Sequence, residues 1–258
     1  MSLDEGVPIR AISRGVAVLQ AVNRAGSISL MQTSRQTQIP YPTVCRIVQT
    51  LLHEGLIEKE PNRKRYRSTA LVQSLSSGFQ DDSRLVKVAR PHIVELTKRV
   101  AWPISIATRV GNMMMVRDST HSLTSLTLSN YSPGYTLPIA ECSTGKVYLA
   151  YCSDEERESI RSGFRISEDA PDKLGLLLTE NGGMIRDIRQ NGYATQVRNI
   201  YTATPGKTSS IAVPIMRDDQ IMGAMALIFF VAGMKMQEAE RRYVPLLKET
   251  AKAISDSL

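Results

Sequence analysis

The sequence predicts an α+β protein built from two domains joined by a linker. Three observations lead to this prediction. Between residues 39 and 68, one helix-like segment with a single apolar face is followed directly by a short basic hairpin pattern. The first third of the chain holds most of the excess positive charge. From residue 104 onward, short apolar segments of strand length are interspersed with longer segments of helical periodicity, which is typical of a sheet covered by helices.

Composition excludes several classes of protein. With 258 residues, 42% of them hydrophobic and 22% charged, the chain is an ordinary globular protein large enough for two domains. No apolar run reaches the roughly 18 residues of a membrane span, and the first residues lack the pattern of a signal peptide. Cys45, Cys142 and Cys152 form neither a zinc pattern nor a disulfide framework. We therefore expect a cytoplasmic protein without a cofactor, a metal ion or a membrane partner.

Charge is unevenly distributed along the chain. Residues 1–80 contain 10 Lys and Arg against 5 Asp and Glu, a net charge of +5, whereas residues 81–258 contain 22 against 20, a net charge of +2. A local positive excess indicates a polyanionic partner for the first part of the chain. The alternative is a basic face that serves only solubility, and the motif described next argues against it.

Residues 39–57 have the pattern of a helix-turn-helix. Ile39-Pro40-Tyr41-Pro42 ends one helix and begins the next, because proline is well tolerated in the first helical turn. The apolar residues of the second helix share one face: Val44, Ile47, Val48, Leu51 and Leu52. Its polar residues share the other face: Thr43, Arg46, Gln49 and His53. Gly55 then ends the helix.

A basic hairpin follows the second helix. Leu56-Ile57-Glu58-Lys59-Glu60 has strand character, Pro61-Asn62 forms a turn, and the run Arg63-Lys64-Arg65-Tyr66-Arg67 returns along it. Together with the preceding helices this predicts a winged helix-turn-helix. A helix with a donor-rich face fits the major groove of DNA, and a basic wing beside it fits phosphate. The expected partner is double-stranded operator DNA.

Individual DNA contacts follow from this pattern. Arg46 and Gln49 should reach base edges or phosphates, because Arg pairs with guanine and Gln with adenine. Tyr41 and Thr43 lie at the helix start, where phosphate contacts are expected. The wing tip should add phosphate or minor-groove contacts through Arg63, Lys64 and Arg65. The alternative for Arg46 is a salt bridge with Glu54 or a position in solvent.

The remaining elements divide the chain into a DNA-binding domain (1–68), a linker helix (69–84) and a second domain (85–258). In the first part we expect helices at 13–25, capped by Ser13, and at 30–38 and 42–54. In the second domain we expect helices at 85–100, 144–152, 154–161, 173–190 and 237–257. The expected strands are 104–109, 113–117, 122–128, 193–197, 208–215 and 222–230.

Several motifs together resemble the IclR family of bacterial transcriptional regulators over nearly the whole chain. They are residues 39–46, Leu51-Leu52-His53-Glu54-Gly55-Leu56-Ile57, Leu137-Pro138, Ser143-Thr144-Gly145-Lys146-Val147-Tyr148-Leu149-Ala150, Asn191-Gly192-Tyr193, residues 210–215 and Gly223-Ala224. Trp102-Pro103 and residues 116–121 resemble the subgroup that controls aromatic-acid catabolism, such as degradation of 3-(3-hydroxyphenyl)propionate. In one departure, Pro42 stands where the family usually has a small hydroxyl residue that caps the helix. Tyr41 and Thr43 would then supply the phosphate contacts.

The resemblance implies a GAF-like effector-binding domain and a catabolic regulator. It also implies a homodimer formed through the DNA-binding domains and the linker helix, or a homotetramer. The partners would be an operator, a small organic acid and, for an activator, RNA polymerase. In such regulators the ligand lies on the sheet under the helix that begins at Ser143. Here Cys142, Ser143, Thr144 and Gly145 are small or hydroxylic, and N–H groups at a helix start favour a carboxylate.

Other residues shape this expected effector site. Ser209 and Ser210 could add hydroxyl donors, whereas Ala226 and Ile228 are apolar at positions where relatives that bind small keto acids carry hydroxyls. An adaptable apolar wall could come from Met115 and its methionine neighbours Met113, Met114, Met222 and Met225. A polar cap over an apolar wall indicates an aromatic or medium-chain acid. The alternatives are that these methionines are ordinary core and that Ser143-Thr144 is only a helix cap.

Two further groups of residues leave other interpretations open. Arg117 could bind a carboxylate, although a salt bridge with Asp118 or a surface role is favoured, and His121 has no partner at metal spacing. A thiol enzyme centred on Cys142 would need a base, and neither His92 nor His121 lies in a catalytic motif. We therefore expect a regulator and not an enzyme. The remaining alternative is a DNA-binding regulator whose second domain is structural and holds no ligand.

Overall fold

The computed structural model describes residues 9–76, 83–127, 131, 133–167, 170–180, 182–202 and 204–258. The chain forms two compact units, Met1–Asp81 and Asp82–Leu258, which are treated one at a time below. Among the described helices, none has both the length and the apolar character needed to cross a membrane.

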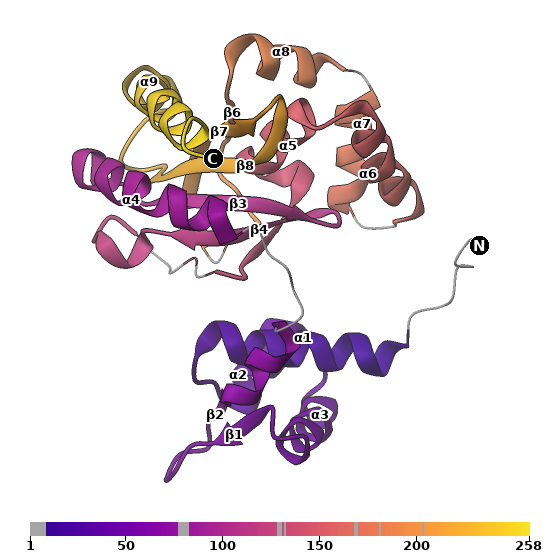
Figure 1. Ribbon diagram of the computed structural model, residues 1–258. Helices are drawn as coiled ribbons and strands as arrows, with labels where there is room; N and C mark the ends of the chain where they lie inside the picture. Colours follow the sequence, from indigo (N-terminus) through magenta and orange to yellow (C-terminus); the bar gives the residue numbers. More distant parts are fainter. Residues whose placement is uncertain are drawn as a thin grey trace. The chain divides into compact units, whose positions relative to one another are not determined.

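The first unit is a three-helix domain with a wing (Figure 1). Its helices are α1 (Arg10–Ala25), α2 (Leu30–Thr37) and α3 (Tyr41–His53). The wing is an antiparallel pair, β1 (Ile57–Lys59) and β2 (Tyr66–Ser68), extended by a bridge between Ile28 and Tyr66. The buried core of the unit is formed by Val18, Val22, Ile28, Ile39, Val44, Val48, Leu51 and Ile57. The predicted winged helix-turn-helix is therefore confirmed.

Local sequence signals explain where these helices begin. Ser29 caps α2 in a reciprocal capping box with Gln32. Pro40 precedes α3, and Pro42 lies in its first turn. The cap predicted for the first helix is wrong: α1 begins at Arg10, so Ser13 lies inside it, and Ile9 precedes the helix without a side-chain cap.

The linker differs from the expected single helix. Residues Ala70–Ser76 form a 3₁₀ helix, η1, and the α-helix α4 (Ser83–Val100) begins the second unit. The part of the expected linker helix at 77–82 lies outside the described residues. Leu71 and Leu75 of η1 are 47% and 65% exposed. Over residues 70–76 the described element is therefore a 3₁₀ helix, where helical periodicity predicted an α-helix.

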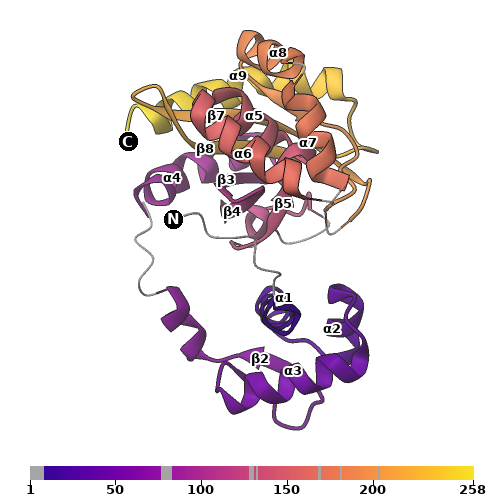
Figure 2. The ribbon, with the colours of Figure 1, turned by 90° about the vertical axis from the view of Figure 1, so that its right-hand side faces the viewer.

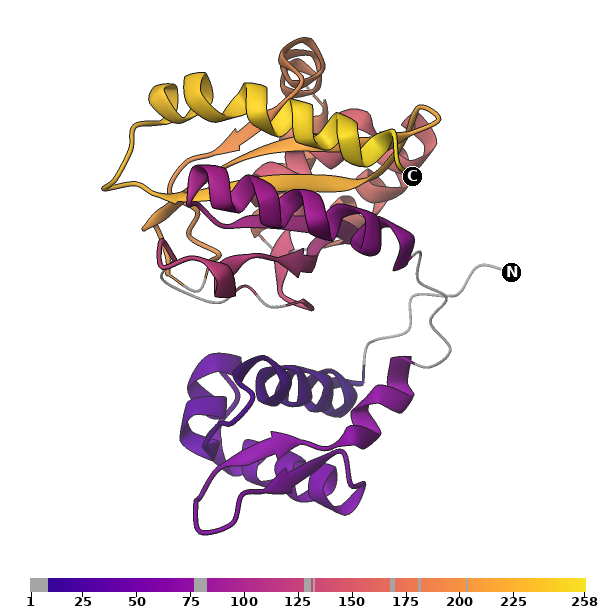
Figure 3. The same ribbon diagram turned by 60° about the vertical axis from the view of Figure 1, so that its left-hand side comes forward.

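The second unit is a six-stranded antiparallel sheet with helices on both faces. Its strand order is β5-β4-β3-β8-β7-β6. The strands are β3 (Ile104–Val110), β4 (Met113–Ser119), β5 (Thr136–Pro138), β6 (Ala194–Gln196), β7 (Thr208–Arg217) and β8 (Gln220–Phe230). On one face α4 and α9 (Met236–Ser255) lie side by side over the largest hydrophobic core (Figure 3).

The opposite face of the sheet carries the other helices (Figure 2). These are α5 (Ser143–Tyr151), α6 (Asp154–Ile166), α7 (Ala170–Glu180) and α8 (Gly183–Asn191). Alternation along β8 separates the two faces: Met225, Leu227 and Phe229 join the core under α4 and α9, whereas Ala224 and Ala226 face α5. Small residues on the α5 side leave space between this helix and the sheet.

Two predicted elements of the second unit are wrong. The expected strand at 122–128 is absent over its described part, where the 3₁₀ helix η2 (His121–Leu123) leads into loop, and position 128 lies outside the described residues. The edge of the sheet is formed instead by β5, which pairs with β4. The single expected helix at 173–190 is two helices, because Gly182 takes a left-handed conformation with φ of 63° between them.

Candidate functional site

The exposed face of α3 carries the residues predicted to contact DNA. Pro42, Arg46, Gln49 and His53 are all exposed and follow one another at helical spacing along a single stripe. Tyr41, at the helix start, is 42% exposed. No ion pair is found for Arg46 among the described residues, so the alternative pairing with Glu54 is not observed. The stripe is exposed within the first unit.

Thr43 adjoins this stripe and shares a hollow with Arg46. It is half-buried and, with Ile47 and Thr50, lines a hollow between α3 and the Ile12–Gly15 turn of α1. Its backbone N–H donates a hydrogen bond to the carbonyl of Pro40. Thr43 therefore lies at the start of α3, beside α1, and is partly exposed.

The wing presents two of its three predicted basic residues. Arg63 and Lys64 are exposed at the tip, beyond a turn in which Asn62 has a φ of 62°. Arg65 turns inward: its Nε donates to Ser27 Oγ at 2.8 Å, and its Nη1 donates to Gln32 Oε1 at 3.3 Å. The predicted tip position of Arg65 is therefore corrected. Its guanidinium fastens the wing to the start of α2.

The second unit contains a hollow between the sheet and the start of α5. Its polar lining is Ser105, Tyr131, Cys142, Ser143, Thr144, Asn199, Thr202, Thr208, Ser209 and Ser210. Its apolar lining is Ala107, Met114, Val116, Leu137, Ala226 and Ile228.

The start of α5 forms the polar cap of this cavity. Cys142 precedes the helix without a side-chain cap hydrogen bond, so the first N–H groups of α5 have no partner within the helix. Ser143 Oγ lies 2.7 Å from Ser210 Oγ of β7, which ties the helix start to the sheet. Gly145 does not line the cavity. Its role is close packing, because a Cβ at this position would lie 1.9 Å from the carbonyl oxygen of Ile139.

Most of the effector residues predicted from the sequence meet at this cavity. Besides Cys142, Ser143 and Thr144, they include Ser209, Ser210, Ala226 and Ile228. The prediction that Met115 lines the cavity is wrong. Met115 lies on the opposite face of β4, and its neighbour Met114 lines the cavity. Met225 is buried in the core under α4 and α9. The apolar wall is therefore mainly aliphatic, with one methionine.

Several lining residues were missed. Ser105 could have been found from the sequence, because it alternates with Ile104 and Ile106, which are buried against α4 and α9. Asn199 is 4% exposed, and its Nδ2 donates to the carbonyl of Glu141 at 2.9 Å. Tyr131 lies in a loop before β5 and carries no periodic signal.

The cavity is electrically neutral over its described lining, which contains no Asp, Glu, Lys, Arg or His. Burial raises the pKa of the Cys142 thiol, which lies 3.3 Å from Thr144 Oγ1, so this cysteine is protonated at neutral pH. In the described part of the chain, no group of three or more His, Cys, Asp or Glu residues could hold a metal ion. Uncharged donors alone would therefore balance the charge of a bound anion.

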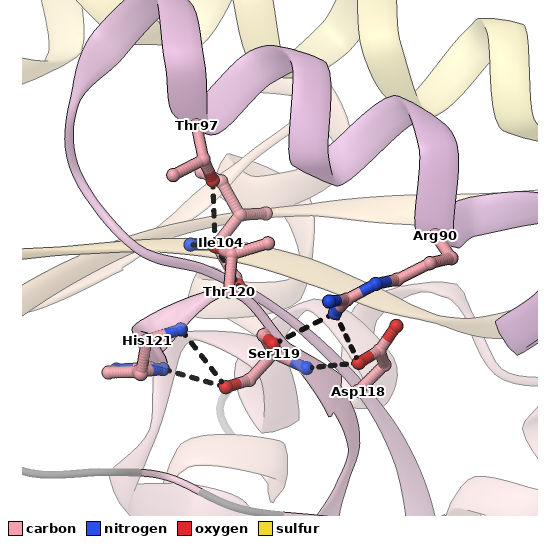
Figure 4. Close-up of polar contacts among 7 residues, drawn as sticks. All are labelled: Arg90, Thr97, Ile104, Asp118, Ser119, Thr120 and His121. Carbon is pink, nitrogen blue, oxygen red and sulfur yellow. Dashed lines mark hydrogen bonds and ion pairs between the residues drawn. The ribbon is translucent and has the colours of Figure 1, made fainter. Parts of the chain in front are cut away.

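A polar network joins the end of β4 to α4 (Figure 4). Arg90 of α4 donates to Asp118 at 2.9 Å and to the carbonyl of Ser119 at 3.0 Å. Asp118 therefore pairs with Arg90 and not with Arg117, whose Nη1 lies 3.3 Å from Thr108 Oγ1. Burial lowers the pKa of His121 to about 4, so this ring is neutral. Its Nδ1 lies 2.9 Å from Ser119 Oγ.

Comparison with known proteins decides the family. Residues 11–61 match the IclR helix-turn-helix domain, and residues 80–256 match the C-terminal domain of the bacterial transcriptional regulator IclR. The chain belongs to the IclR family. This family consists of DNA-binding transcriptional regulators, and the two matched regions cover the winged domain and the domain that contains the cavity.

Individual relatives are distant. The HTH-type transcriptional regulator TsaQ1/TsaQ2 of Comamonas testosteroni is 23% identical over 61% of this chain, and the match spans 57% of that protein. The Pca regulon regulatory protein of Pseudomonas putida is 23% identical over 96% of this chain and 84% of its own length. An IclR homologue of Microbacterium hydrocarbonoxydans, solved with 4-hydroxybenzoate, has a TM-score of 0.62 at 20% identity and covers 96% of this chain and 98% of its own. This last likeness shows the fold.

Proposed function

We propose that this IclR-family protein is a ligand-responsive regulator of a catabolic operon, with an aromatic or other small organic acid as effector. The observation that carries the proposal is the cavity under the start of α5. Its cap supplies helix N–H groups without an intrahelical partner and the Ser143 and Thr144 hydroxyls, and its wall supplies aliphatic carbon. The positive end of a helix dipole stabilises a carboxylate in such a position without a basic side chain.

The shape of the wall favours a cyclic body on this acid. Ala107 and Ala226 keep the sheet surface flat, while Met114, Val116 and Leu137 form an apolar side. A tiny keto acid would bury little of this surface. Two relatives agree with the proposal: one is a Pca regulon regulatory protein, and one was solved with 4-hydroxybenzoate.

On the DNA side we propose that two winged domains of a homodimer read two half-sites of an operator. Arg46 and Gln49, exposed on α3, would contact base edges, and Tyr41 and Thr43 would contact phosphate at the helix start. Arg63 and Lys64 of the wing would add phosphate contacts. Pairing of dimers would give a homotetramer, and an activator would also contact RNA polymerase.

The contacts of α4 offer a route from effector to DNA. This helix follows the linker directly, and its Arg90 holds Asp118, two residues beyond Val116 in the cavity wall. A ligand that displaces β4 would therefore change the position of α4. Regulation requires that the acid binds one of the two resulting arrangements more tightly than the other.

Two alternatives make different predictions. A thiol enzyme at Cys142 is disfavoured because burial raises the pKa of its thiol, and the described hydrogen bonds of Cys142 go to Thr144 and to the carbonyl of Ile139. Nucleophilic cysteines instead have a lowered pKa and an adjacent base. A regulator with a structural, ligand-free second domain would bind DNA but no acid.

A thermal-shift screen of the purified protein tests the proposal. We would compare hydroxylated and plain aromatic acids, dicarboxylates and short keto acids, each beside its methyl ester as an uncharged control. A ligand at about 100 times its Kd should add about 2.7 kcal/mol to the free energy of unfolding. A shift with an aromatic acid but not its ester supports the proposal. A shift only with keto acids refutes the aromatic effector, and no shift with any acid refutes ligand responsiveness.

A further inference from the structure

We infer that the hydroxyl of Tyr131 recognises a hydroxyl group on the effector, so that the cavity selects a hydroxylated aromatic acid with a single carboxylate. This inference rests on the proposed function and adds the second polar contact of the same cavity. The carboxylate of the ligand would lie at the start of α5, and its hydroxyl would lie beside Tyr131 in the same cavity.

Tyr131 is a buried residue whose polar atom has no partner. The residue is 6% exposed and lines the cavity, and its hydroxyl makes no hydrogen bond to any described residue. Nearly all buried polar side-chain atoms in proteins are paired, so each unpaired one calls for an explanation. A ligand group that pairs with this hydroxyl supplies one.

Aromatic contacts hold the ring of Tyr131 in place. The ring of Tyr131 lies edge to face with Tyr135, with centroids 4.9 Å apart, and it lies 4.7 Å from the ring of His121. His121 is itself 2% exposed and held by Ser119, and Tyr135 donates a hydrogen bond to the carbonyl of Tyr201. The phenol is therefore clamped between two rings that are each held in place, and it stays in the cavity wall.

The chemistry of the lining argues for a hydroxyl and against a second carboxylate at the Tyr131 end. A phenol can both donate and accept, as an alcohol or phenol on the ligand can. A second carboxylate would need charge compensation, and the described lining offers neither a cation nor a second helix start there. A hydroxy acid satisfies both ends of the cavity, whereas a dicarboxylate leaves one charge buried without compensation.

Calorimetric titration of Tyr131→Phe with matched acids tests the inference. The probes are 4-hydroxybenzoate against benzoate, and 3-(3-hydroxyphenyl)propionate against 3-phenylpropionate. Wild-type protein should prefer the hydroxylated member of at least one pair by roughly tenfold or more, since a buried hydroxyl left unpaired weakens binding by that order. Tyr131→Phe keeps the ring, so it should bind the plain acid within about threefold of wild type and lose the preference.

Controls separate the possible failures. Tyr193→Phe removes a phenol from a residue outside the cavity lining and should keep the wild-type preference. An unchanged preference in Tyr131→Phe, or no preference in wild type while acids still bind, overturns the inference and leaves the proposed function intact. Absence of binding of all four acids to wild type overturns both. If Tyr131→Phe does not fold, Tyr131→Met also lacks the hydroxyl and is judged by the same preference.

Discussion

Replacing Gly145 with alanine should displace the start of α5 and, with it, the polar groups that cap the cavity. A Cβ built at this position lies 1.9 Å from the carbonyl oxygen of Ile139, 2.6 Å from its carbonyl carbon and 2.7 Å from its Cα. All three neighbours are backbone atoms, which move only together with their segment. Ordinary contact would require α5 and the 3₁₀ helix η3 (Ile139–Glu141) to separate by about 1.5 Å. The helix N–H groups and the hydroxyls of Ser143 and Thr144 would move with that shift.

The cost of this substitution follows from its geometry. Overpacking of a rigid position costs about 3 kcal/mol at the upper end of its usual range, and the lower entropy of alanine in the unfolded chain offsets about 0.5–1 kcal/mol. The net loss of about 2 kcal/mol should lower the Tm of a domain of this size by about 4–8 °C. Differential scanning fluorimetry measures this loss. Affinity for an acid that stabilises the wild-type protein should fall more than tenfold, because the donors at the helix start are displaced.

Gly183→Ala is the matched control, since nothing lies within 4 Å of a Cβ at that helical glycine. It should leave both Tm and acid affinity unchanged or raise Tm slightly. A Gly145→Ala protein with the Tm of the control and the acid affinity of wild type would refute the argument. Close packing at Gly145 would then not position the start of α5.

Two further predictions concern the exposed helix and the buried histidine. Arg46→Ala should weaken specific operator binding by about 1–3 kcal/mol in a fluorescence anisotropy titration, with Arg161→Ala as the control; equal affinities would contradict the role of Arg46. Because burial lowers the pKa of His121 to about 4, the unfolded chain takes up this proton first as the pH falls. Its stabilising contribution should be complete above pH 6.5 and be lost toward pH 4, by up to about 3 kcal/mol. In urea unfolding experiments, the free energy of unfolding of His121→Phe should fall less with decreasing pH than that of wild type. An equal fall in the two proteins would contradict the prediction.

The DNA-binding unit could be predicted from sequence because its signals are local. Alternation between buried and exposed positions along α3 requires only helical periodicity, and Pro42 marks the first turn. The position of Arg65 had no such signal. Its partners, Ser27 and Gln32, are 38 and 33 residues away, so its inward turn depends on the folded arrangement of the wing against α2.

The cavity shows the same division between local and distant information. Its cap could be predicted from small and hydroxylic residues at the start of α5, but the choice between Met114 and Met115 depends on strand register. A shift of one residue moves a side chain to the other face of a sheet. β3 and β4 also contain a register irregularity next to Ala107, which a two-residue period does not anticipate. Small errors in strand position therefore changed the predicted wall.

Two lining residues could not be predicted from periodicity. Asn199 and Tyr131 come from loops, where side chains are placed by the scaffold and not by periodicity. Both polar atoms of the Asn199 side chain have a partner, because the amide donates to the carbonyl of Glu141 and accepts from the N–H of Tyr201. Tyr131 retains an unused hydroxyl. A paired residue shapes the cavity whether or not a ligand is present, whereas an unpaired buried hydroxyl gains its hydrogen bond only when a ligand provides one. Discrimination among acids of similar size should therefore depend on Tyr131 more than on the cap of α5, which any carboxylate can use.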